Sequence, residues 1–365
     1  MSDLPKDLVE EILCRVPASY LSELRYTCKR WNRLFNKKRF TRKHLDKAAK
    51  QFLVLMSKQD RVCLISVNFC GVPSVEIKGE QRRMIGLDEF EIFKVSHCDS
   101  LLLCNNKKKN RIVVWNPCTG QTRWIQPTKI GSYALGSYQD QKYGDTSYKI
   151  LSCCVYGDNN EFEILPKKKN EFEIYEFNTN SWRTLDVTLD CELDKCVPGM
   201  SLKGKTYWFA SDEKEEQLGM FLVCFDYTTE IFDRLLFPCK CLYDEALSLS
   251  VVREEKLSVL LQRGGDTLRR EIWVTNKIDE AKVVSWSKFL TVDMKPECSF
   301  GLTSFLVDEE KKSIVLCHLI LRRNGVPSEQ GVYIVGEDNN VKQVHSGFVS
   351  SLPNLFDYVP SLTQI

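Results

Sequence analysis

Two short stretches near the start of the chain place apolar residues at helical spacing. The first begins at Pro5, a residue tolerated in a first helical turn, and ends at Pro17, because the residue before a proline leaves the α region. The second runs from Leu21 to Phe35 with apolar residues at steps of three and four, and its opposite face is basic. This pattern predicts a helical module of about fifty residues, a size that is marginal as an independent folding unit.

From Gln51 onward the chain consists of short runs of β-branched and aromatic residues. Runs such as Ile112–Trp115, Phe221–Tyr227 and Ile314–Leu319 are typical of strands, and Asn324-Gly325 is typical of the turns between them. Repeated short strands over about 315 residues indicate a mainly β region, either a sandwich array or a propeller.

An internal repeat favours the propeller over the sandwich. Asn116, Asn178, Asp226 and Asn276 each follow a strand and precede an aromatic residue, at separations of 62, 48 and 50 residues. The Asn or Asp is expected to accept the hydrogen bonds of the turn, and the aromatic residue to cover the face of the next blade. This period matches a kelch-like blade of four strands and predicts six blades, with seven as the alternative.

Charge separates the helical module from the β region. Residues 1–50 carry 13 Lys/Arg and 6 Asp/Glu, a net +7, whereas residues 51–365 carry 38 and 43, a net −5. The segment from Arg25 to Lys50 would also suit nucleic-acid binding. A run of like charges is more often a solvated face, or one that steers docking to an acidic partner. We therefore expect two parts with different partners, and no nucleic acid among them.

The sequence argues against a secreted, metal-binding or catalytic protein. It shows no signal-peptide pattern and no run of 18 apolar residues, which predicts an intracellular protein, in the nucleus or cytoplasm, that does not span a membrane. Its 16 cysteines form no CxxC pair and its four histidines lie far apart, so neither disulfides nor a metal site are expected. No phosphate loop, GxSxG or HExxH motif is present, so no cofactor and no enzymatic activity are expected.

The order of residues in the helical module is similar to the F-box motif. The matching segments are Leu4-Pro5-x-x-Leu8, Ile12-Leu13-x-Arg15-Val16-Pro17, Leu21-x-x-Leu24-Arg25 and Cys28-Lys29-Arg30-Trp31. The resemblance implies a three-helix module, residues 1–48, that binds a Skp-type adaptor and through it a cullin scaffold. The adaptor-binding residues that it implies are Leu4, Pro5, Leu8, Ile12, Leu13, Val16, Leu21, Leu24, Cys28 and Trp31. Periodicity alone equally allows that the helices only pack on the β region.

Residues 49–365 resemble the F-box-associated domain of type 1. Matching segments include Trp115-Asn116-Pro117, Ala134-Leu135-Gly136 and the ending Tyr358-Val359-Pro360-Ser361-Leu362. One departure is Ser100, where the family usually has a turn glycine; serine tolerates a positive φ less well, so an altered hairpin is expected there. The resemblance implies a non-catalytic substrate-recognition subunit of an SCF ubiquitin ligase, whose β domain holds a target protein. A carbohydrate- or small-ligand-binding propeller without a ligase role is the alternative.

Three long segments of the β domain are candidates for target binding, since function concentrates in loops held by a rigid scaffold. They are residues 128–147, 188–199 and 322–330. In the first, tyrosines recur every five residues from Tyr133 to Tyr148, which matches neither the strand nor the helix period. We therefore expect a wide loop there.

Overall fold

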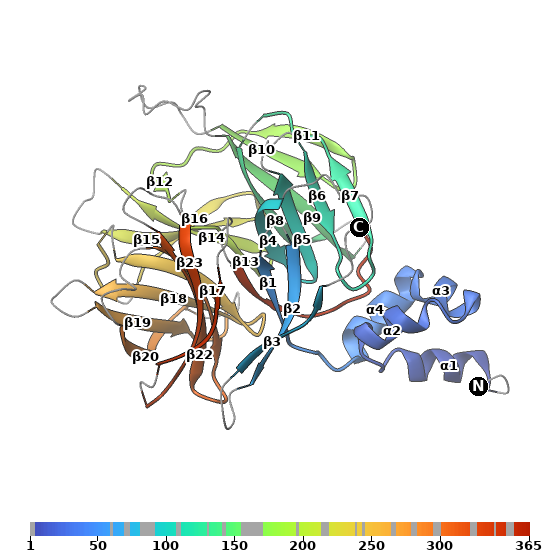
Figure 1. Ribbon diagram of the computed structural model, residues 1–365. Coiled ribbons are helices and arrows are strands. Elements are labelled where there is room, and N and C mark those ends of the chain that lie inside the picture. Colours follow the sequence, from blue (N-terminus) through green and yellow to red (C-terminus); the bar gives the residue numbers. More distant parts are fainter. Residues whose placement is uncertain are drawn as a thin grey trace.

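The fold is mainly β, with a small helical module beside a ring of sheets (Figure 1). The computed structural model describes residues 4–58, 61–68, 74–80, 92–106, 111–129, 131–140, 144–154, 171–194, 197–212, 219–237, 239–242, 245–263, 268–278, 283–294, 301–321, 327–338, 341–347 and 354–365. The C-terminus lies at the side of the ring that faces the helices (Figure 1). The expected fold class is confirmed.

Four helices form the N-terminal module, where three were expected: α1 (Lys6–Leu13), α2 (Ala18–Leu24), α3 (Lys29–Phe35) and α4 (Lys38–Lys47). Pro5 and Pro17 directly precede α1 and α2, as the sequence predicts. The second predicted stripe is broken because Cys28 is extended, with φ −148° and ψ 122°. Because of this turn, α2 and α3 are two separate helices that pack on one core, rather than one continuous helix.

Six antiparallel sheets form the blades of a propeller, so the count of six rather than seven is confirmed. Blade 1 comprises β25 (Asn354–Tyr358), β1 (Leu53–Lys58), β2 (Arg61–Asn68) and β3 (Ser74–Glu80); blade 2, β4 (Ile92–Cys98), β5 (Leu101–Asn106), β6 (Ile112–Trp115) and β7 (Thr122–Ile125); blade 3, β8 (Gly131–Asp140), β9 (Asp145–Cys154), β10 (Glu171–Glu176) and β11 (Ser181–Leu185). Blade 4 comprises β12 (Glu192–Leu193), β13 (Met200–Leu202), β14 (Lys205–Ser211), β15 (Met220–Asp226) and β16 (Phe232–Leu235); blade 5, β17 (Ala246–Val252), β18 (Lys256–Arg263), β19 (Leu268–Thr275) and β20 (Trp286–Met294); blade 6, β21 (Gly301–Asp308), β22 (Ser313–Leu321), β23 (Pro327–Gly336) and β24 (Val341–Gly347).

The ring is closed by its two ends. Strand β25, from the end of the chain, pairs with β1 from the start of the propeller, in a register that runs from Leu53 opposite Tyr358 to Ser57 opposite Asn354. Side chains of β25 are buried in the seams of blade 1 with its neighbours. This pairing covers the edge of β1, which would otherwise be left unpaired.

The Asn and Asp residues of the repeat lie at the turn between the third and fourth strands of their blades. The Oδ1 of Asn116 accepts bonds from the backbone N–H groups two and three residues further along, at 2.9 and 3.1 Å. Asp226 makes the same pair of bonds, at 2.8 and 3.1 Å. Asn276 accepts across a wider loop, whereas Asn178 instead donates to Asp140 at 2.8 Å. The predicted turn role therefore holds at three of the four positions.

The aromatic residues of the repeat cover the preceding blade, so the prediction that they cover the next blade is wrong. Trp182 of blade 3 donates its indole N–H to the carbonyl of Gln126, which follows blade 2, at 3.0 Å. Trp286 of blade 5 donates to the carbonyl of Leu236, which follows blade 4, at 3.2 Å. Trp124 of blade 2 packs in the seam with blade 1, and Phe232 of blade 4 packs in the seam with blade 3. The alternation of side chains along a strand determines that the aromatic side chain points from one face of the sheet. The twist of the blades decides whether that face packs on the preceding or the next blade.

Segment 128–147 is not the wide loop that was expected. Strands β8 and β9 form a long hairpin in which Tyr138 lies opposite Ser147. Tyr133 and Tyr148 are both buried in the seam between blades 2 and 3, whereas Tyr143 lies outside the described residues. Tyr133 and Tyr138 lie on β8 and Tyr148 on β9, so these three tyrosines do not belong to one loop.

The other two candidate loops differ in how much of them is strand. Residues 327–330 belong to β23, and 322–326 lie outside the described residues. Where the structure describes it, segment 188–199 is a connection that carries only the two-residue β12.

Gly136 on β8 allows a close approach between blades 3 and 4. A Cβ at this position would lie 1.9 Å from Cε2 of Tyr227, a fully buried ring whose hydroxyl bonds Thr206 and the carbonyl of Ala134. We expect Gly136→Ala to lower the free energy of unfolding by about 3 kcal/mol, because a packed core resists added volume. Denaturant unfolding measures this. Gly144→Ala isolates the backbone cost: Gly144 has a positive φ but no neighbour within 4 Å, so a smaller loss of about 1–2 kcal/mol is expected there. Unchanged stability of Gly136→Ala would contradict the close packing against Tyr227.

Candidate functional site

Helix α1 carries two apolar faces. Val9 and Leu13 point into the module and are 5% and 2% exposed. Leu8 and Ile12, each one residue earlier, are 52% and 44% exposed, and Leu4, just before the helix, is 40% exposed. Because residues four apart share one helix face, Leu8 and Ile12 lie together on the outside of the module, and Leu4 is exposed just before the first turn of the helix. We call these three residues the outer row.

The other predicted adaptor-binding residues fall into three groups. Pro5 is exposed beside the outer row. Leu13 and Leu21 are buried in the core of the module. The remaining four are partly buried: Val16, Leu24, Cys28 and Trp31. The structure therefore leaves Leu4, Pro5, Leu8 and Ile12 exposed at the surface, and it places Leu13 and Leu21 in the core that the helices share.

Two exposed aromatic residues on the module were missed from the sequence. Tyr20 on α2 is 56% exposed and Tyr26, in the turn after α2, is 67% exposed. Neither belongs to an apolar stripe at helical spacing or to the segments that match the F-box motif. Large exposed aromatic side chains are common anchors at protein interfaces.

Helix α1 is held against α4 by charge. Glu11 lies 2.8 Å from the ammonium of Lys43 and 2.7 Å from that of Lys47, and it also pairs with Arg15. Together these cations lower the pKa of the Glu11 carboxyl to about 2. Some of the basic residues of the helical module therefore stabilise the module itself, because they hold in place the helix that carries Leu8 and Ile12.

His44 of α4 fastens the same region from inside. Its Nε2–H donates to the carbonyl of Val16 at 2.8 Å, and the side chain is 3% exposed. Burial lowers the pKa of His44, which keeps the ring neutral near pH 7. A neutral, hydrogen-bonded histidine is a structural contact between α4 and the turn after α1.

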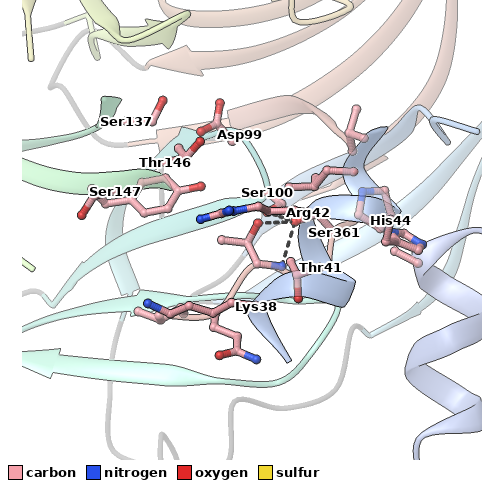
Figure 2. Close-up of a pocket in the computed structure, with 18 of the residues that line it drawn as sticks. Lys38, Thr41, Arg42, His44, Asp99, Ser100, Ser137, Thr146, Ser147 and Ser361 are labelled. Carbon is pink, nitrogen blue, oxygen red and sulfur yellow. Dashed lines mark hydrogen bonds between the residues drawn. The ribbon is translucent and has the colours of Figure 1, made fainter. Parts of the chain in front are cut away.

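A cavity of about 720 Å³ lies where the helical module meets the propeller (Figure 2). Its walls come from α4, from the first turns of blades 2, 3 and 5, and from the C-terminal segment. Many of its polar groups already bond within the protein: Ser147 with Asn178 at 3.2 Å, and Glu254 with Lys50 at 2.8 Å. Asp99 interacts with Ser137 and Tyr148, and burial raises the pKa of its carboxyl. We interpret this cavity as the seam between the two modules.

The described residues contain no group of three or more His, Cys, Asp or Glu side chains placed to hold a metal ion. Within the same residues, no helix is both long enough and apolar enough to cross a membrane.

Both parts of the chain match known protein families. Residues 1–43 match the F-box domain, and residues 52–365 match the F-box associated beta propeller domain. The chain belongs to the F-box proteins. A probable F-box protein of Arabidopsis thaliana (At5g47300) is 55% identical over 374 residues, covering 100% of this chain and 87% of that protein. An Arabidopsis thaliana F-box/kelch-repeat protein (At3g44120) is 44% identical over 392 residues, covering 100% of this chain and 97% of that protein. Among solved structures, a chain of a nidogen/laminin complex aligns with a TM-score of 0.43 and 8% identity, over 84% of this chain and 98% of that one.

Membership of this family gives the chain a general role. An F-box module joined to a β-propeller is the architecture of a substrate-recognition protein, and F-box proteins are in general non-catalytic adaptors. The F-box domain also implies a Skp-type adaptor as the partner of the helical module.

Proposed function

We propose that this F-box protein is the substrate-recognition subunit of an SCF ubiquitin ligase. Residues 1–48 bind a Skp-type adaptor and through it a cullin scaffold, and residues 49–365 hold a target protein for ubiquitination. The observation that carries the proposal is the outer row, which stays exposed although the inner face of α1 is fully packed.

The outer row has no structural role that explains its chemistry. Val9 and Leu13 on the adjacent face of the helix already fill the core of the module. Contiguous exposed apolar side chains typically mark a protein interface. Burying them contributes roughly 25 cal/mol for each Å² of apolar surface removed from water. An adaptor with an apolar groove would supply that burial.

Charge on the module suits an acidic adaptor. Lys29, Arg30 and Arg33 on α3 are exposed. Complementary charge around an apolar contact mainly speeds association and selects the partner. We therefore assign the basic face of α3 to steering, and the outer row to affinity.

We place target binding on the propeller face away from the helices. The turns at Asp99, Gly144 and Glu254 lie on the helix side, where they line the seam cavity. Because successive strands are antiparallel, the connections between blades emerge at the opposite face. Segment 188–199 is one of these connections, and it remains our candidate for contact with the target. Asp190 there is 77% exposed and pairs with Arg234 at 3.0 Å.

No residue of this chain performs covalent chemistry in the proposed role. The ligase reaction is accelerated because target lysines are held close to a ubiquitin-loaded enzyme, which raises their effective concentration. The rate then depends on how firmly the propeller is oriented relative to the adaptor.

The proposal is tested by reconstitution. The full chain, mixed with a Skp-type adaptor and a cullin scaffold, is expected to elute from size exclusion as one complex of the three. A pull-down from cells with proteasomal turnover blocked is expected to recover ubiquitinated target along with the adaptor. Elution of the adaptor apart from the folded chain would contradict the proposed role.

A further inference from the structure

The last residues of the chain join the propeller to the helical module. After β25 the chain continues as Val359–Ile365, which we call the strap. Leu362 is 1% exposed and completes the core of the helical module together with Leu13, Leu21 and Phe35. A side chain from the end of the propeller domain thus fills the centre of the N-terminal module.

Asn116 fastens the strap to blade 2. While its Oδ1 accepts the two turn bonds described above, its Nδ2 donates to the carbonyls of Ser361 at 3.2 Å and Thr363 at 2.8 Å. The side chain is fully buried. One amide therefore holds both a propeller turn and the strap.

The repeat shows why position 116 needs an amide. Asp226 makes the same turn in blade 4, so a carboxylate suffices for the turn. A carboxylate has no N–H to donate. The two strap bonds are thus the function that requires Asn at 116.

Ser100 adds a second polar contact. Ser361 donates its hydroxyl to Thr363 at 2.7 Å, which leaves Ser100 to donate to Ser361 at 2.6 Å. The expected distortion of this hairpin does not occur, because the positive φ falls on Asp99, at 53°. The serine that departs from the family pattern instead bonds the strap, as Figure 2 shows for the side chains of Ser100 and Ser361.

Other side-chain contacts also link the two modules. Cys118 Sγ donates weakly to the carbonyl of Ala18 at 3.5 Å, and Gln364 of the strap donates to the carbonyl of Asn36 at 2.5 Å. The covalent connection is the short segment 48–52, which lies in neither a helix nor a strand. Without the strap, the helical module would lose Leu362 from its core and the bonds of Ser361 and Thr363 to blade 2.

We propose that the strap sets the angle between the adaptor-binding face and the propeller, with Asn116, Ser100 and Leu362 as positioning residues. This inference rests on the proposed function for its purpose, because a ligase needs its target at a fixed place. The arrangement itself is independent of that function and is tested separately.

The test replaces Asn116 by aspartate in the full chain. Asn116→Asp keeps the turn, as Asp226 shows, but sets a buried carboxylate against two carbonyl oxygens and so expels the strap. Small-angle X-ray scattering of the free chain is expected to show a larger maximum dimension at unchanged helix content. Asp226→Asn, which alters the matching turn in blade 4, is the control and is expected to leave scattering unchanged.

A second variant changes the strap at its contact with the helical module rather than with the propeller. Leu362→Ala removes the side chain that the strap places in the core of the helical module. Cys118 should then be alkylated about tenfold faster, since its protection depends on the helical module staying packed against blade 2. Cys239, which is half-buried and does not line the seam cavity, is the internal reference. Unchanged scattering in Asn116→Asp together with unchanged Cys118 alkylation in Leu362→Ala would overturn the proposal.

Adaptor affinity separates the inference from the proposed function. If the strap positions the module, Asn116→Asp binds the adaptor as tightly as the parent chain while its scattering changes. Loss of circular-dichroism helix signal in Asn116→Asp would show a folding role and overturn the positioning role. Failure of the parent chain to bind any adaptor would refute the ligase role, and the scattering result on the free chain would still decide the strap.

Discussion

Replacing Leu8 and Ile12 together by aspartate is expected to reduce adaptor binding at least 100-fold while leaving the chain folded. Each substitution would bury an unpaired carboxylate in an apolar contact, at a cost of several kcal/mol. Both residues are about half exposed in the free chain, so the charges remain in water until the adaptor binds. Isothermal titration calorimetry with the purified adaptor measures the loss.

Leu45→Asp is the matched control for this pair. Leu45 is 52% exposed, as Leu8 is, but lies on α4 rather than in the outer row. We expect Leu45→Asp to keep full affinity. Leu13→Asp, by contrast, should unfold the module, because Leu13 is 2% exposed in its core. Equal affinity of the Leu8/Ile12 double variant and the parent would refute the assignment of the outer row.

Ending the chain at Pro353 is expected to abolish folding of the propeller. This truncation removes β25 and with it the buried side chains of Leu355, Phe356 and Tyr358. Loss of a large buried side chain costs roughly 3–5 kcal/mol, and three such losses match the whole stability of a typical domain. The strand edge left on β1 would also favour aggregation. Soluble yield and thermal unfolding of the truncated chain are the measurements.

Ending the chain at Tyr358 is the control, since it keeps β25 and removes only the strap. That chain is expected to stay soluble and to unfold cooperatively. A chain ending at Pro353 that is monomeric and unfolds at the same temperature as the parent would argue against closure by β25. The same closure predicts that residues 51–200 cannot fold as a half-ring.

Local chemistry was readable from the sequence. The prolines that precede α1 and α2, the turn role of Asn116 and Asp226, and the count of six blades all follow from spacing and backbone preference. The outer row was contained in the predicted set, but helical periodicity could not separate Leu8 from Leu13. The two lie on different faces of one short helix, and only the packing of α2, α3 and the strap decides which face is buried.

The tertiary structure decided what depends on contacts between distant segments. The sequence by itself determined a helical module followed by a propeller and favoured six blades over seven, because short-range patterns of turn and strand residues specify the elements. It did not determine that aromatic residues seal the preceding blade, since that depends on the twist accumulated across each sheet. Nor did it show that Leu362 enters a core formed by residues 9–40, because two segments more than 300 residues apart share no local pattern. Ser100 is an example. Its position in a turn suggested an altered hairpin, because serine tolerates a positive φ less well than glycine. Its hydrogen-bond partner, Ser361, comes close only when the ring closes.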